Sequence, residues 1–190
     1  PLAKNVLLAV PTVASLFLVF FSIGVAIGSV AVNLLLKGNV SSRYSPISVL
    51  LMACMVAVFY FVCKAWNAGL RDTQLMDVAT FLSYPLAWAV LGSLLLIAIF
   101  GGMFVVPLYA FLTTKVPASQ ASRAVAANNI VNSGAMVGGS LAAMGLNAAG
   151  VPITEQVLLC AGMCLFSAWL GKRLVDAETQ AAEAARAAGA

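Results

Sequence analysis

Charged residues are scarce in this chain, and histidine is absent. Of its 190 residues, 8% are charged and 63% are hydrophobic, whereas roughly a quarter of the residues in an average soluble domain are charged. The chain therefore has too few charges to cover a water-exposed globular surface. Without histidine, the usual His-based metal sites and nucleophile and base pairs are excluded, so we expect no enzyme activity, no bound metal and no cofactor.

Long uncharged runs fill most of the sequence. Because a membrane-spanning helix needs about 20 mostly apolar residues, we predict an all-α membrane protein with a bundle of five transmembrane helices in 1–175. The last span is short unless Glu155 lies at the membrane interface. Residues 176–190 are Ala-rich and favour helix, and we interpret them as a cytoplasmic tail or linker. The predicted spans are 8–34, 45–64, 86–113, 124–148 and 154–171.

Basic residues are concentrated in alternate connections between the spans. A net charge of +4 could indicate nucleic-acid binding in a soluble protein, but membrane topology explains it here, and we expect no nucleic-acid partner. Cytoplasmic loops carry an excess of Lys and Arg. This rule places the first connection, the third connection and the C-terminus in the cytoplasm. The basic residues concerned are Lys37, Arg43, Lys115, Arg123, Lys172 and Arg173.

The first span then begins on the outer side, which is unusual for a complete protein. The chain starts with Pro1 instead of Met, and no charged segment or cleavage site of a signal peptide precedes the first span. We therefore expect this sequence to be a fragment whose upstream part is missing.

Small residues in three of the spans indicate close helix packing. In lipid, helices associate through small residues and interhelical hydrogen bonds, so we predict that 8–34, 86–113 and 124–148 are interior helices. The other two spans are bulky and apolar, and we expect them to face lipid. Pro107 removes an amide donor, so a kink is expected near it, either static or moving. The candidates for packing or a hinge are Gly24, Gly28, Gly101, Gly102, Pro107, Gly134 and Gly138.

Asparagines make the fourth span the most polar of the five. Asn128, Asn129 and Asn132 lie within five residues of one another, and an amide in hydrocarbon must be paired or face a watery cavity. We interpret these residues as contacts along a substrate pathway; structural pairing, or capping near the membrane surface, is the alternative. Asn33 in the first span and Tyr109 in the third complete this candidate pathway.

Two stretches of the chain resemble the lysophospholipid transporter branch of the major facilitator superfamily. The late-helix region of that family is similar to GGMFVVPLYAFLTTKVPASQASRAVAANNIVNSGAMV, at 101–137, and its eighth helix and following loop are similar to FSIGVAIGSVAVNLLLKGNVS, at 21–41. The resemblance implies that the five spans are helices 8–12 of a twelve-helix fold whose N-terminal half is missing. The loop after the eighth helix differs, because Asn33 lies within the helix and Lys37 beyond it, where family members commonly have a basic pair.

The function implied by this resemblance is movement of lysophospholipid to the cytoplasmic leaflet of the bacterial inner membrane by alternating access. Membrane lipid and a fused or adjacent acyltransferase are the implied partners. An efflux carrier for drugs or other amphiphiles, and a non-transporting subunit that anchors an acyltransferase, are the alternatives. Candidates for headgroup or gate contacts in the cytoplasmic loops are Lys37, Arg43, Lys115 and Arg123, although the charge bias of such loops also predicts these residues.

Overall fold

The computed structural model describes residues 11–36, 44–69, 76–114 and 116–188. Every regular element in these ranges is helical, which confirms the all-α fold class. The elements are α2 (Pro11–Leu35), α3 (Ser45–Gly69), α4 (Val78–Ser83), α5 (Pro85–Thr114), the 3-10 turn η1 (Ala118–Gln120), α6 (Ala121–Ala148) and α7 (Ile153–Ala188).

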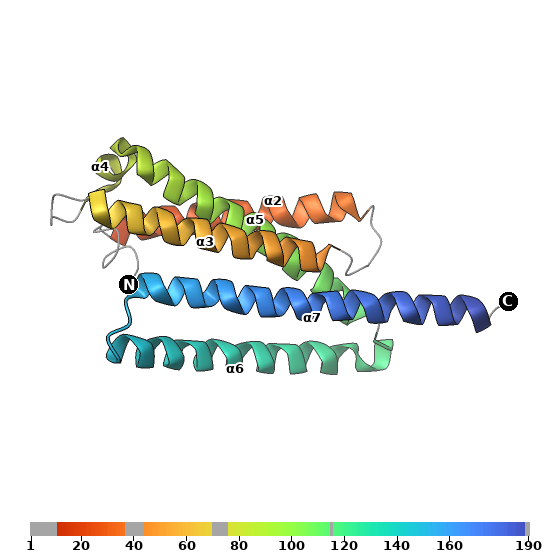
Figure 1. Ribbon diagram of the computed structural model, residues 1–190. Helices are drawn as coiled ribbons and strands as arrows, with labels where there is room; N and C mark the ends of the chain where they lie inside the picture. Colours follow the sequence, from red (N-terminus) through yellow and green to blue (C-terminus); the bar gives the residue numbers. More distant parts are fainter. Residues whose placement is uncertain (1–10, 37–43, 70–75, 115, 189–190) are drawn as a thin grey trace.

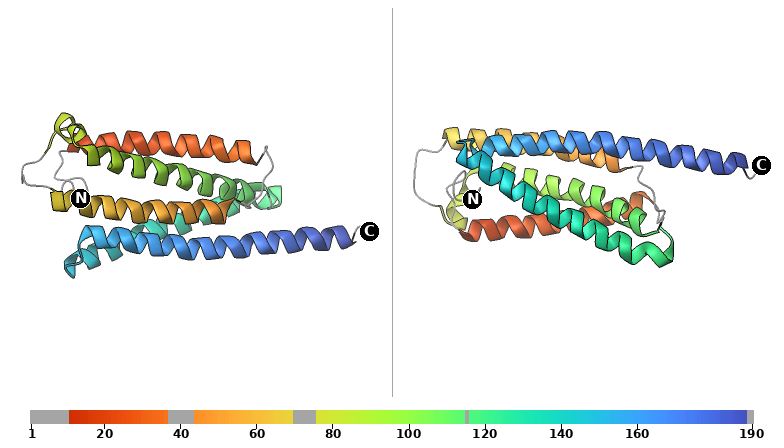
Figure 2. Two further views of the ribbon diagram at one scale, coloured as in Figure 1. Left: turned by 45° about the horizontal axis from the view of Figure 1, so that its top comes forward. Right: turned by 90° about the horizontal axis from the view of Figure 1, so that it is seen from below.

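The five long helices run up and down along a common direction (Figure 1). The extensive contacts join α2 to α5, α5 to α3, and α3 to α7, whereas α6 touches α5 and α7 only sparsely. The right view of Figure 2, from below, shows α6 crossing one face of the bundle diagonally in front of the other helices. The described chain is therefore a packed group of four long helices with a fifth helix beside it.

Four helices are long and apolar enough to cross a membrane, which supports a multi-pass membrane protein. The fifth predicted span, 124–148, is helical within α6 but is not among the four, because its asparagines, glycines and serines lower its hydropathy. The four candidate spans are Thr12–Leu35, Ser45–Ala68, Pro85–Ala110 and Ile153–Ala177.

Two helices extend beyond the predicted spans. The span predicted at 45–64 continues as α3 to Gly69. The span predicted at 86–113 corresponds to α5, and the short helix α4 precedes it; the side chain of Asp77 caps α4 by accepting a hydrogen bond of 2.9 Å from the Thr80 amide. The last helix does not end near residue 171. It continues as α7 through the Ala-rich segment to Ala188, over 36 residues, which gives it a length of roughly 54 Å.

Burial within the described chain corrects one expectation. α3 was predicted to face lipid, yet it has the largest buried share of the four candidate spans, because it lies between α5 and α7. α6 was predicted to be an interior helix of a larger bundle, and within the described chain none of its residues is buried. Bulky side chains recur on α3 at helical spacing and form its packed face: Val49, Ala53, Val56, Phe59, Tyr60, Cys63 and Trp66.

Glycines bring the backbones of α2 and α5 into direct contact. A Cβ atom added at Gly24 would lie 2.7 Å from the Leu95 carbonyl oxygen, and one added at Gly102 would lie 2.7 Å from the Val25 carbonyl oxygen. Gly28 is equally restricted by the Ile99 backbone. The two helices can approach this closely only because these positions lack side chains.

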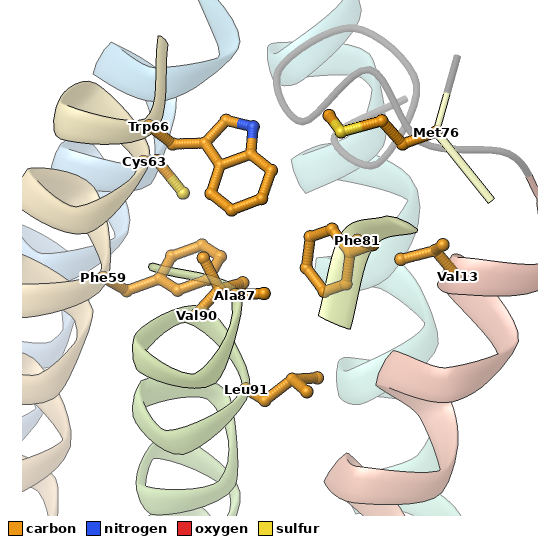
Figure 3. Close-up of a cluster of buried hydrophobic side chains, with 9 residues drawn as sticks. All are labelled: Val13, Phe59, Cys63, Trp66, Met76, Phe81, Ala87, Val90 and Leu91. Atoms are coloured by element: carbon orange, nitrogen blue, oxygen red, sulfur yellow. The ribbon is translucent and has the colours of Figure 1, made fainter. Parts of the chain in front are cut away.

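An apolar cluster fills the end of the bundle near α4 (Figure 3). Its centre is Phe81, which is fully buried, with its ring centroid 5.1 Å from that of Trp66 and 5.9 Å from that of Phe17. The cluster thereby joins α2, α3, α4 and α5 at one end of the molecule. Its buried members are Val13, Phe59, Cys63, Trp66, Met76, Phe81, Ala87, Val90 and Leu91.

Candidate functional site

The three clustered asparagines lie in a stretch of α6, residues 126–145, in which every residue is exposed. Asn128, Asn129 and Asn132 are all exposed. At about 100° per residue, they span an arc of about 100° around the helix axis. The structure therefore presents three amides on one side of a helix that the rest of the described chain does not cover.

A second, separate face of α6 carries small residues. Gly134 and Gly138 lie roughly opposite the asparagine arc by the same angular rule. An added Cβ atom would meet nothing within 4 Å at either position, in contrast to Gly24 and Gly28 on α2. The GxxxG motif of α2 thus packs against α5, whereas no described residue packs against the GxxxG motif of α6.

The other two pathway candidates lie on different helices. Asn33 is exposed near the end of α2, and Tyr109 is 44% exposed near the end of α5. The C-terminal ends of α2 and α5 lie at the same end of the molecule (Figure 1). Neither residue, and none of the three α6 asparagines, lines either of the two cavities described below.

The hinge candidates in α5 remain within a continuous helix. Gly101 faces Met52 of α3, with 3.6 Å between its added Cβ atom and the Met52 sulfur, and Gly102 faces α2. Pro107 is fully buried inside α5. Because proline has no amide hydrogen, the helix lacks one internal hydrogen bond at this point.

Basic residues gather at one end of the molecule. Of the four gate candidates, Lys37, Arg43 and Lys115 lie outside the described residues, and Arg123 is exposed in the first turn of α6. This end also holds the 168–174 segment of α7, which includes Lys172 and Arg173 (Figure 1). The guanidinium of Arg173 stacks on the Trp169 ring, 4.2 Å from its centroid.

Two cavities occur at this basic end, on either side of Gly171. One has a volume of about 370 Å³ and lies between α3 and α7. The other, of about 210 Å³, lies between α5 and α7 and is lined by Phe104, Leu108, Ser167, Leu170, Gly171 and Leu174. Gly171 lines the smaller cavity. At Gly171 α7 lies close to α3, because an added Cβ atom would be 3.6 Å from the Pro46 backbone.

A polar network at the opposite end was not foreseen from the sequence. The hydroxyl group of Tyr60 donates a hydrogen bond of 3.0 Å to Oε1 of Glu155, and Nζ of Lys64 donates one of 3.4 Å to the Tyr60 hydroxyl oxygen. Glu155 lies in the first turn of α7, where the helix dipole favours a negative charge. The sequence could have indicated the contact between Tyr60 and Lys64, because these residues are one helical turn apart. It could not have indicated that Glu155 is their partner.

Thiols and carboxylates do not gather into a metal site in the described part of the chain. No group of three or more His, Cys, Asp or Glu residues that could hold a metal ion is found there. The four cysteines are free: Cys63 is buried in α3, Cys164 is partly buried, and Cys54 and Cys160 are exposed.

The arrangement offers amides on an uncovered helix, apolar grooves and basic residues at one end. These groups can bind and orient an amphipathic molecule. Comparison of the chain with models of protein families, with curated proteins and with solved structures gives no match.

Proposed function

We propose that this chain is part of a secondary transporter that moves lysophospholipid across a bacterial inner membrane by alternating access. The observation that carries the proposal is the exposed asparagine arc of α6, formed by Asn128, Asn129 and Asn132. The family resemblance of 21–41 and 101–137 supplies the substrate class. In this proposal, the basic end and the C-terminus are cytoplasmic, in agreement with the positive-inside bias.

In this proposal α6 crosses the membrane together with the four more apolar candidate spans, so its three amides on one side need polar partners. An unpaired polar group in hydrocarbon is costly, and intramembrane polar residues typically face the bundle interior or a water-filled cavity. The helices of the described chain do not cover this arc. We infer that it faces a cavity whose other wall comes from a further set of helices, the N-terminal half of the transporter.

An amphipathic substrate suits these groups. Amides can bind a polar headgroup, while the apolar helices beside them can accommodate an acyl chain. The four candidate spans have few charges to pair with a sugar or an organic ion. This combination supports lysolipid over a small polar solute.

The packing also supports movement of α6 relative to the other helices. Extensive contacts join α2 to α5, α5 to α3 and α3 to α7, whereas α6 has few contacts with α5, η1 and α7. Alternating access requires groups of helices that shift against one another around a fixed site. A helix with few contacts can shift without disturbing the packed core.

Uptake of labelled lysophosphatidylethanolamine into proteoliposomes containing the full-length protein tests this function. Asn128→Leu, Asn129→Leu and Asn132→Leu should each slow uptake by about 3- to 30-fold, which corresponds to a loss of about 0.6–2 kcal/mol of hydrogen bonding. Ile130→Leu is the matched control, because Ile130 is an apolar α6 residue that is 73% exposed and lies roughly opposite the asparagine arc by the same angular rule. Its uptake should remain normal.

Two further arms keep the test decisive. Asn→Gln variants keep an amide at each position and should retain more uptake than the Leu variants, which a merely misfolded helix would not show. Normal uptake in all three Leu variants would exclude the pathway role of the arc. Uptake that drugs inhibit and lysolipids do not would replace the lysolipid assignment with an efflux carrier for other amphiphiles.

A further inference from the structure

The larger cavity at the basic end is an apolar groove with a single cationic side chain at its edge. Its volume of about 370 Å³ falls within the range of about 300–1,000 Å³ that is typical of small-molecule sites. α3 and α7 form its two walls. The groove is lined by Pro46, Ile47, Leu50, Ala168, Trp169 and Lys172.

The lining is accessible from outside the bundle. Ile47 is 57% exposed, Leu50 is 46% exposed and Trp169 is 48% exposed. These residues lie in two candidate spans, Ser45–Ala68 and Ile153–Ala177. In a membrane the groove is therefore open to lipid and not to the interior of the bundle.

The position of Lys172 matches the boundary between hydrocarbon and headgroups. From Ile153, where α7 begins, to Lys172 the helix rises about 28 Å at 1.5 Å per residue. The hydrocarbon core of a bilayer is about 30 Å thick. With Glu155 near one surface, Lys172 lies at the other, and the apolar part of the groove extends from there into the membrane.

Charge at the groove favours an anion. Lys172 and Arg173 are both exposed, and Asp176 is the acidic residue one turn further along α7, which leaves one net positive charge on this stretch. Arg173 is held against the Trp169 ring by a cation–π interaction. Trp and basic residues together at a membrane surface are typical of an interfacial anchor, and basic pockets between membrane helices bind lipid headgroups.

We propose that this groove binds an anionic phospholipid of the surrounding leaflet. Its phosphate accepts a hydrogen bond from the Lys172 ammonium, and one acyl chain lies along Ile47 and Leu50 between α3 and α7. The site is distinct from the α6 asparagine arc, and the lipid bound here is a resident molecule, not the transported one. The proposal stands whether or not the chain transports lysolipid.

Quenching of Trp169 fluorescence by brominated lipids tests the proposal. The full-length protein is reconstituted in phosphatidylcholine vesicles that contain an equal mole fraction of either brominated phosphatidylglycerol or brominated phosphatidylcholine. The Trp169 signal is the difference between the wild type and Trp169→Phe. Brominated phosphatidylglycerol should compete for the site about fivefold better, which is the preference that one basic residue confers near an anionic surface.

Three variants determine the origin of that preference. Lys172→Gln should abolish it, whereas Arg123→Gln, which removes an exposed charge from α6 at the same end, should leave it intact. Ala168→Phe fills the groove and keeps every charge, so it should reduce quenching by either lipid. Retention of the full preference in Ala168→Phe would mean that anionic lipid merely accumulates near the basic end, and would overturn the site.

Two other results would also overturn the proposal. Equal quenching by the two brominated lipids would show that the groove does not select anionic lipid. No quenching by either lipid would show that a protein surface covers the groove in the full-length molecule.

Discussion

The hydroxyl group of Tyr60 donates a hydrogen bond to Oε1 of Glu155 across a distance of 3.0 Å, and this bond joins α3 to the first turn of α7. Tyr60 is 7% exposed, so its hydroxyl has little access to solvent. The bond gives a buried phenol a charged acceptor and fixes α7 against α3 at the end of the bundle opposite the basic residues.

Removal of this bond should destabilise the fold measurably. Tyr60→Phe deletes the hydroxyl and should lower the free energy of unfolding in detergent by about 1.5–3 kcal/mol, because hydrogen bonds to charged groups contribute in that range. Glu155→Gln keeps an acceptor oxygen and should cost less. Tyr84→Phe is the control: Tyr84 is 41% exposed, so its loss should stay within about 0.5 kcal/mol. An equal effect of the two Phe variants would contradict the prediction.

Glycine-to-alanine substitutions should distinguish glycines that contact a neighbouring helix from glycines that have free space beside them. Gly28→Ala places a methyl group 2.8 Å from the Ile99 carbonyl carbon, and a backbone atom cannot rotate away. We expect a loss of about 1–3 kcal/mol from overpacking. Gly92→Ala on α5 meets nothing within 4 Å and should be neutral or gain up to about 1 kcal/mol through helix propensity. Thermal unfolding in detergent measures both, and an unaffected Gly28→Ala would disprove the close backbone contact.

Truncation of Phe81, the central residue of the apolar cluster, should strongly lower the free energy of unfolding. Phe81 is fully buried between Trp66 and Phe17, so Phe81→Ala should destabilise the protein by about 3–5 kcal/mol. Phe21→Ala is matched in chemistry but affects a side chain that is 42% exposed, and its cost should be several times smaller. Chemical denaturation, followed by tryptophan fluorescence, compares the two. Similar losses would mean that the cluster is not a core.

The cap of α4 should titrate at low pH. The side chain and then the backbone amide of Thr80 donate hydrogen bonds to Asp77, and they hold the pKa of its carboxyl group below the ordinary value of 3.8. Because the folded pKa is the lower one, the cap stabilises α4 above about pH 3.8 and loses this effect as the pH falls through the folded value. An NMR titration of the Asp77 carboxyl carbon checks the direction. Asp77→Asn keeps a capping oxygen and should remove the transition, and an inflection above pH 3.8 would refute the assignment.

The helical architecture could be predicted from the sequence because it depends on local signals. Uncharged runs of sufficient length set α2, α3, α5 and α7. α3 continues five residues beyond its predicted end at 64, and α7 continues beyond residue 171 to Ala188. Alanine-rich sequence favours helix whether or not it lies in lipid. The end of a hydrophobic run therefore did not mark the end of the helix.

The sequence predicted the burial of each helix less accurately than it predicted the helices themselves. The bulk of α3 suggested a lipid-facing helix, but side chains such as Val56 and Phe59 fill the space between α5 and α7 just as effectively as they would face acyl chains. Small residues indicated that α2 and α5 pack closely against neighbours, but not that they pack against each other, and not whether α6 has a neighbour in this chain. Tyr60 and Glu155 are 95 residues apart, and the hydrophobic periodicity of a single sequence does not indicate such long-range pairs.

The glycine contacts between α2 and α5 also constrain how this molecule can change shape. Where main chain rests on main chain, no side chain can adopt a new rotamer to absorb a shift, so even a small slide would force atoms to overlap. α2 and α5 should therefore move together as one rigid body. Any rearrangement must take place where helices share fewer contacts, and in the described chain α6 has few contacts with α5 and with α7.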